Sequence, residues 1–166
     1  RSEWHSGATD RCQRHRGTTA LRVDPGVTAT IGANIDGSGI LNKLDTGTLV
    51  LNGANTYSGG TQLDGGKIIV GSNTALGSGT LTANAGTQLD SNAAVTLGNA
   101  ATLNGNLTLV GSNALTLNGV IGGTGGLIKT GAANLTLGGN NAFLGPVALN
   151  SGGLILASNS ALGSGT

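Results

Sequence analysis

The sequence predicts an all-β protein whose short strands stack into a solenoid of about seven coils. Two observations predict this fold. Residues 37–80 return as residues 123–166, at an offset of 86 and with 20 identities over 44 positions. Within each copy, apolar and polar residues alternate in short runs that glycine-rich turns separate. A unit this small cannot bury its own apolar face, so neighbouring units must stack into one elongated core.

The N-terminal segment, residues 1–20, differs from the rest of the chain. It holds the only Trp, the only Cys and both His residues, and it shows neither the repeat nor the apolar region of a signal peptide. Cys12, with His5, Asp10 and His15 nearby, lacks the paired spacing of a zinc motif. We expect this segment to hold no metal and to lie outside the stacked core. The sequence leaves open whether it is disordered, not native to the protein, or a true but atypical segment.

Residues 21–166 form one domain without a linker. The alternation begins at Leu21 and continues between the two copies, through the aliphatic residues Leu81, Leu89, Val95, Leu97, Leu103, Leu107, Leu109, Leu115, Leu117 and Ile121. Four residues that end alternating runs are predicted to point inward at equivalent places, namely Leu51, Leu137, Val70 and Leu156. The offset of 86 is expected to correspond to about four coils of some twenty residues.

Composition supports this assignment. The chain contains 32 glycines, three aromatic residues and 9% charged residues, so aliphatic side chains must build the core. No window carries apolar residues at helical spacing, and glycines interrupt every candidate helix at a cost of roughly 1 kcal/mol each. The sequence therefore predicts almost no helix.

The residues of the first copy carry a resemblance to a known family. Asn52-Gly-Ala-Asn-Thr-Tyr-Ser-Gly-Gly-Thr61, followed by Gly65 to Leu81, resembles the autotransporter-associated β-strand repeat, also called the passenger-associated transport repeat. The second copy departs from it at Pro146 and Val147 but keeps Lys129 and the closing residues 158–166. The resemblance implies a right-handed parallel β-helix in the passenger of a bacterial autotransporter, which a C-terminal membrane barrel exports to the cell surface.

Several other classes of protein are excluded. A nucleic-acid surface needs a basic stripe with stacking aromatic residues, and Lys129 is the only charged residue after Asp90. A calcium-binding β-roll needs an aspartate that the stretch from Gly122 to Ile128 lacks. A porin needs girdles of aromatic residues, which three aromatics cannot supply. No membrane span is predicted.

No enzyme motif is complete, and we predict no catalytic, cofactor-binding or metal-binding residues. The stretch Gly60–Lys67 is misspaced for a phosphate loop and has Ile68 where Ser or Thr must follow. Both histidines lie in the atypical segment, so a Ser-His-Asp triad has no base. The aspartates are predicted to be turn residues. They would indicate a polysaccharide-acting β-helix only if two or more met within ~10 Å in one groove. They are Asp24, Asp36, Asp45, Asp64 and Asp90.

Matched polar and aromatic residues in the two copies are interpreted as structural. Asn55 with Asn141, and Asn73 with Asn159, are predicted to join side-chain ladders at turns, and Tyr57 and Phe143 to fill a corner of the core.

The predicted function is that of a non-catalytic structural segment of a secreted or surface-displayed adhesin-type passenger, which assists passenger folding and export. Its expected partners are the translocator barrel of the full-length protein and a host surface or a second copy. The alternatives are a polysaccharide-acting enzyme fragment and a self-associating adhesin. Since the chain has no initial Met, export signal or barrel, we expect a piece of a longer passenger that associates end to end in isolation.

Overall fold

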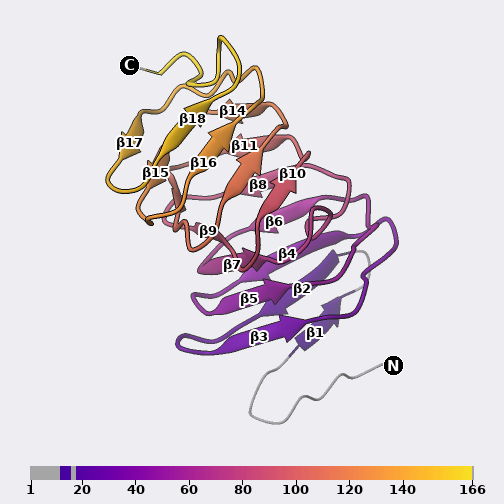
Figure 1. Ribbon diagram of the computed structural model, residues 1–166. Helices are drawn as coiled ribbons and strands as arrows, with labels where there is room; N and C mark the ends of the chain where they lie inside the picture. Colours follow the sequence, from indigo (N-terminus) through magenta and orange to yellow (C-terminus); the bar gives the residue numbers. More distant parts are fainter. Residues whose placement is uncertain (1–11, 16–17, 166) are drawn as a thin grey trace.

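The computed structural model describes residues 12–15 and 18–165, and within these ranges it shows eighteen β-strands and no helix. The coils of the chain stack along one axis, and their strands form three sheets that run along the rod. The strands β1 to β3 lie at one end of the rod, and β17 and β18 lie at the other (Figure 1). No helix in the described part of the chain could cross a membrane. The predicted all-β solenoid is thus confirmed.

Sheet A contains β1 (Cys12–His15), β2 (Thr18–Arg22), β4 (Ile40–Leu44), β6 (Thr61–Leu63), β8 (Leu81–Ala83), β11 (Ala101–Leu103) and β14 (Ile121–Gly123). Sheet B contains β3 (Thr28–Ile31), β5 (Thr48–Leu51), β7 (Lys67–Val70), β9 (Gln88–Ser91), β12 (Leu107–Leu109), β15 (Leu127–Lys129) and β17 (Val147–Leu149). Sheet C contains β10 (Val95–Leu97), β13 (Leu115–Leu117), β16 (Leu135–Leu137) and β18 (Leu154–Leu156).

Each coil contributes one strand to sheet B, and the seven strands of that sheet correspond to the predicted seven coils. All pairs within sheets B and C are parallel, and successive partners in sheet B lie 19–21 residues apart. In the first coils, irregular backbone takes the side that sheet C occupies later. There, the amide of Thr56 donates to the carbonyl of Ile35 at 2.8 Å, and that of Ser78 to Tyr57 at 2.9 Å. The coil is therefore continuous around its whole circumference.

The two repeat copies do not lie on the same face of the rod. Leu41 belongs to β4 of sheet A, whereas its counterpart Leu127 belongs to β15 of sheet B. Likewise, β5 of sheet B corresponds to β16 of sheet C. Since a coil is close to 20 residues long, four coils leave six of the 86 residues. Six residues carry the chain from one sheet to the next, as from Ile121 to Leu127.

The sequence predicts that the offset of 86 residues corresponds to about four coils. The structure adds six residues, which place the second copy one sheet further around the coil. The repeat spans four and one third coils, and the second copy is turned by a third of a coil relative to the first. Side chains that match in sequence consequently point into the core from different sheets of the rod.

The core is a column of aliphatic side chains, each of which stabilises the fold by ~1.5–3 kcal/mol when fully buried. Leu51, Leu137 and Val70 have no exposed surface, as predicted, although Leu51 and Leu137 lie in different sheets. Leu156 differs, because it is 47% exposed. It lies in β18, the end strand of sheet C, so no further strand covers it.

The sheets begin before the predicted domain boundary at residue 20. The strand β2 spans that boundary and pairs in parallel with β4, from Thr18 opposite Ile40 to Arg22 opposite Leu44. The strand β1 pairs with β2 in the antiparallel direction and is the end strand of sheet A. Residues 1–11, which make up most of the predicted atypical segment and include His5 and Asp10, lie outside the described residues.

Candidate functional site

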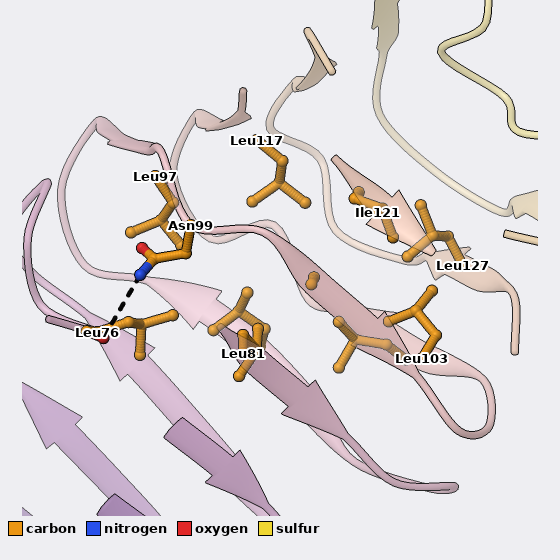
Figure 2. A pocket seen from close by; sticks show the side chains of 11 residues that line it. Leu76, Leu81, Leu97, Asn99, Leu103, Leu117, Ile121 and Leu127 are labelled. Carbon is orange, nitrogen blue, oxygen red and sulfur yellow. Dashed lines mark hydrogen bonds between the residues drawn. The ribbon is translucent and has the colours of Figure 1, made fainter. Parts of the chain in front are cut away.

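A cavity inside the rod, between the middle coils, is too small to hold a ligand. This cavity has a volume of ≈ 10 Å³ and is lined mainly by leucine side chains from all three sheets (Figure 2). At its edge, Asn99 donates through Nδ2 to the carbonyl oxygens of Gly77 and Gly79, at 3.1 and 2.8 Å. A cavity of about this volume holds at most one water molecule, and an apolar one stays dry. It is a packing gap.

Three of the five aspartates after residue 20 follow successive strands of sheet A. Asp24 comes after β2, Asp45 after β4 and Asp64 after β6, so all three lie along one edge of that sheet. The carboxylate of Asp45 accepts from Arg22 at 3.3 Å, in an exposed ion pair. That of Asp64 accepts from the amide groups of Gln62 and Asn84, at 3.0 and 2.7 Å. Asp45 also has a φ of 61°, as expected for a turn residue.

The remaining two aspartates lie elsewhere. Asp36 is exposed between β3 and β4. Asp90 is buried, and its carboxylate accepts from the backbone amides of Ser91 and Ser112 at 2.9 Å and from the Ser112 hydroxyl at 2.7 Å. Among the described residues, no group of three His, Cys, Asp or Glu side chains could hold a metal ion.

Two buried lysines are the polar groups that sequence reasoning missed. Lys43 and Lys129 occupy the same position in the two copies, and each is at most 1% exposed. The ammonium of Lys43 donates to the carbonyl oxygens of Leu44, Asp45 and Gly65, at 2.7, 2.9 and 3.2 Å. Because Gly65 belongs to the following coil, this side chain ties two successive turns together.

Lys129 repeats this arrangement. Its ammonium donates to the carbonyl oxygen of Gly131 and, at 3.4 Å, to that of Ser151 one coil further on. Burial lowers the pKa of Lys43 and of Lys129 below the usual value, while the nearby Asp45 and Asp90, respectively, act in the opposite direction. Both lysines fall at inward positions of the alternation, but a charged side chain in a strand is ordinarily expected to face water.

The matched asparagines bridge three coils through the backbone. Asn55 accepts from the amide of Ile35 in the preceding coil at 2.8 Å and donates to the carbonyl of Ala75 in the following coil at 2.6 Å. Asn141 makes the same two bonds, with Ile121 at 2.9 Å and Ala161 at 2.6 Å. Both side chains are buried. They satisfy backbone groups of neighbouring coils. The prediction that Asn55 and Asn141 stack on other asparagine side chains is therefore wrong.

The matched aromatic residues are core residues, as predicted. Tyr57 is 1% exposed and Phe143 is fully buried. The Tyr57 hydroxyl lies 2.5 Å from the Thr61 hydroxyl, and burial raises the pKa of Tyr57 to about 12, with the Thr61 hydrogen bond opposing that shift. In the second copy, Phe143 and Val147 replace this pair, so both hydroxyl groups are absent together. A buried hydroxyl needs a hydrogen-bond partner. The first copy pairs two hydroxyl groups with each other, and the second copy has neither of them.

This exchange predicts a coupling between Tyr57 and Thr61. Tyr57→Phe leaves the Thr61 hydroxyl with a single long bond to the Leu76 carbonyl, at 3.4 Å. Each single change, Tyr57→Phe or Thr61→Val, is expected to lower the free energy of unfolding by ~1–3 kcal/mol, whereas the double change stays closer to wild type. Urea denaturation of the four proteins measures the coupling. Strictly additive effects would contradict it.

Comparison with known proteins identifies the repeat. The family model of the Passenger-associated-transport-repeat matches residues 41–70 and again residues 127–156. Over 149 residues, or 83% of its length, the chain is 37% identical to the Adhesin BmaC autotransporter of Brucella suis biovar 1 (strain 1330). Residues 41–70 and 127–156 are thus two copies of the passenger-associated transport repeat. The chain spans 4% of the length of that relative. No solved structure matches it.

The two passenger repeats agree at inward positions. From Leu41 to Asn55, every residue that is identical in the second copy is buried in both copies. These positions are Leu41, Lys43, Leu49, Leu51, Gly53 and Asn55 in the first copy and Leu127, Lys129, Leu135, Leu137, Gly139 and Asn141 in the second. Between them, the outward residues all differ, for example Thr48 and Asn134, or Asn52 and Gly138. This part of the passenger repeat therefore preserves a core and not a surface, whereas the closing part also keeps outward residues, such as Asn73 and Ser78 as Asn159 and Ser164.

Proposed function

We propose that this chain is a non-catalytic structural segment of a secreted or surface-displayed adhesin-type autotransporter passenger, and that it assists passenger folding and export. One observation carries this proposal. Between Leu41 and Asn55, the residues common to both copies are buried leucines, lysines, asparagines and one glycine, and the outward residues between them differ. A motif that bound a ligand through this stretch would have to keep outward side chains there.

The placement of the copies supports the same conclusion. The strands β4 and β5 present the first copy on sheets A and B, while β15 and β16 present the second on sheets B and C. A flat ligand could not meet equivalent faces of both copies at once. We propose that any contact with a host surface is made by non-repeated outward residues of the longer protein.

The longer protein supplies the expected partners. In the proposed arrangement, a C-terminal translocator barrel anchors the passenger in the outer membrane, and the segment folds outside the cell. Parallel coils of about 20 residues suit this route, since each coil can pack as soon as its neighbour is in place.

The hydrogen bonds of the aspartates support the absence of catalysis. A glycoside hydrolase needs one carboxylate free to act as a base or nucleophile and a second as an acid, ~5–10 Å apart. Asp45 is paired with Arg22, and Asp64 with two amide groups. Asp90 accepts three hydrogen bonds. These contacts give Asp45 and Asp64 a structural role at turns. Asp90 has a structural role within β9, so its prediction as a turn residue is wrong.

A display experiment tests the proposal. The chain is fused between an export signal and a translocator barrel, and the amount on intact cells is measured by protease accessibility. The inward change Leu49→Asp is expected to lower display by ~tenfold, because an unfolded passenger is degraded, while the adjacent outward change Thr48→Asp leaves it unaltered. Equal display of both variants would contradict a structural role.

Two further readouts separate the alternatives. Release of reducing sugars from polysaccharides by the purified chain, if abolished by Asp45→Asn, would favour the enzyme. Clumping of the displaying cells would favour the self-associating adhesin.

A further inference from the structure

The dipeptide Asn-Gly occurs three times in the chain, each time within the sequence Leu-Asn-Gly. The asparagines are Asn52, Asn104 and Asn118, and each directly follows the last residue of a strand, namely β5, β11 and β13. All three asparagines are exposed. Since their neighbours in sequence are the same, any difference in the chemistry of these three side chains comes from the fold.

Asparagine is a thermolabile residue, above all before glycine. The backbone nitrogen of the glycine attacks the side-chain carbon Cγ of the asparagine, because no Cβ stands in the way. A five-membered succinimide forms, and Nδ2 leaves as ammonia with the proton of the glycine amide. Water then opens the ring at either carbonyl, which gives aspartate or isoaspartate.

The attacking nitrogen is available at all three places. Within the part of the chain that the structure describes, the amides of Gly53, Gly105 and Gly119 donate to no carbonyl oxygen. The reaction is therefore controlled by how freely each asparagine side chain can turn towards this nitrogen.

The side chains of Asn52 and Asn104 are held by other coils. Asn52 accepts through Oδ1 from Nδ2 of Asn92 at 2.9 Å, 40 residues further along the chain. Asn104 donates through Nδ2 to Oδ1 of Asn84 at 2.8 Å, one coil earlier. Each of these hydrogen bonds must break before Cγ can approach the glycine nitrogen.

The side chain of Asn118 is not held in this way. Its backbone is fixed, since its amide donates to the carbonyl of Leu97 at 2.9 Å. Its side chain packs over Gly138 of the next coil, where a Cβ would come within 2.2 Å of Oδ1. It makes no hydrogen bond to a residue in the described ranges 12–15 and 18–165.

We propose that the fold makes Asn118 the site of spontaneous deamidation in this chain, with water as the only co-reactant. Breaking one hydrogen bond beforehand slows the reaction by about two- to tenfold. Asn118 is therefore converted ahead of Asn52 and Asn104. This inference concerns the covalent chemistry of the coils and does not depend on the adhesin assignment.

The conversion matters for the fold because the backbone around Gly119 is closely packed. A Cβ on Gly119 would meet the carbonyl oxygen of Asn99 at 1.9 Å, and one on Gly139 would meet the carbonyl oxygen of Gly119 at 2.3 Å. Isoaspartate adds a methylene group to the main chain between residues 118 and 119, and the coils on either side leave no room for it. We expect faster hydrogen exchange in β13 of aged wild-type chain than in equally aged Asn118→Gln protein.

Peptide mass spectrometry after timed incubation in mildly alkaline buffer tests the proposal. In the folded chain, Asn118 is expected to lose ammonia ~two- to tenfold faster than Asn52 and Asn104. In urea, where the coils are unfolded, the three rates should become equal. The matched variant Asn92→Ala removes the partner of Asn52, so the rate at Asn52 should rise towards that of Asn118.

Three results would overturn the proposal. The first is a rate at Asn118 in the folded chain that is no higher than the rates at Asn52 and Asn104. The second is an equal advantage of Asn118 in urea, since the sequence and not the fold would then select it. The third is an unchanged rate at Asn52 in the Asn92→Ala variant, because the hydrogen bond would then have no part in the selection.

Discussion

Leu137→Asp is expected to abolish the folded state of the coils around sheet C. Leu137 is fully buried in β16, between β13 and β18. An aspartate there would place a carboxylate among aliphatic side chains without a partner, at a cost of several kcal/mol. Since domains have only ~5–15 kcal/mol of net stability, this one change can unfold the chain. Leu51→Asp in sheet B is expected to act in the same way.

The adjacent residue supplies the control. Thr136 points outward from the same strand, so Thr136→Asp adds the same charge without burying it. Circular dichroism and urea denaturation should show a folded Thr136→Asp protein with a free energy of unfolding within ~0.5 kcal/mol of wild type. Folded, cooperative unfolding of both Leu51→Asp and Leu137→Asp would contradict the inward register.

Lys43→Glu is expected to be nearly as damaging. The Lys43 ammonium donates to three backbone carbonyl oxygens in two coils and is fully buried. A carboxylate in its place would point its negative oxygens at those carbonyls and leave them without a donor. Loss of a buried charged partner costs ~3–5 kcal/mol, and repulsion adds to that cost.

Lys67→Glu is the matched control, because Lys67 lies at an outward position of β7 and the change in net charge is identical. Thermal unfolding should place Lys67→Glu close to wild type and Lys43→Glu far below it or unfolded. Lys129→Glu, in the second copy, should behave like Lys43→Glu. Equal stability of the Lys43 and Lys67 variants would show that the carbonyl contacts contribute nothing.

The buried lysines also show why part of the candidate site could not be predicted. Polar residues in a strand are expected to face water, and a lone lysine between leucines does not reveal that three carbonyl oxygens converge on it. Those carbonyls belong to turns up to 22 residues away, such as Gly65 for Lys43. The matched asparagines are similar, since their partners lie 20 residues before and after them.

The end of the rod illustrates the same limit. Leu63 and Leu149 occupy the same position in the two repeat copies, yet Leu63 is fully buried and Leu149 is 49% exposed. Periodicity assigns both to the inner face. Burial depends on the presence of a further coil, which is a property of the stack and not of the residue.

The sequence by itself determined the solenoid, its seven coils, the inward direction of Leu51, Leu137 and Val70, and the passenger repeat. These follow from local alternation and from a repeat long enough to compare with itself. Only the tertiary structure decided that the offset of 86 residues spans four and one third coils, so that the second copy faces a different side of the rod. The physical reason is that the coil length is set by strand pairing between coils, at 19–21 residues, and not by the distance over which the sequence repeats.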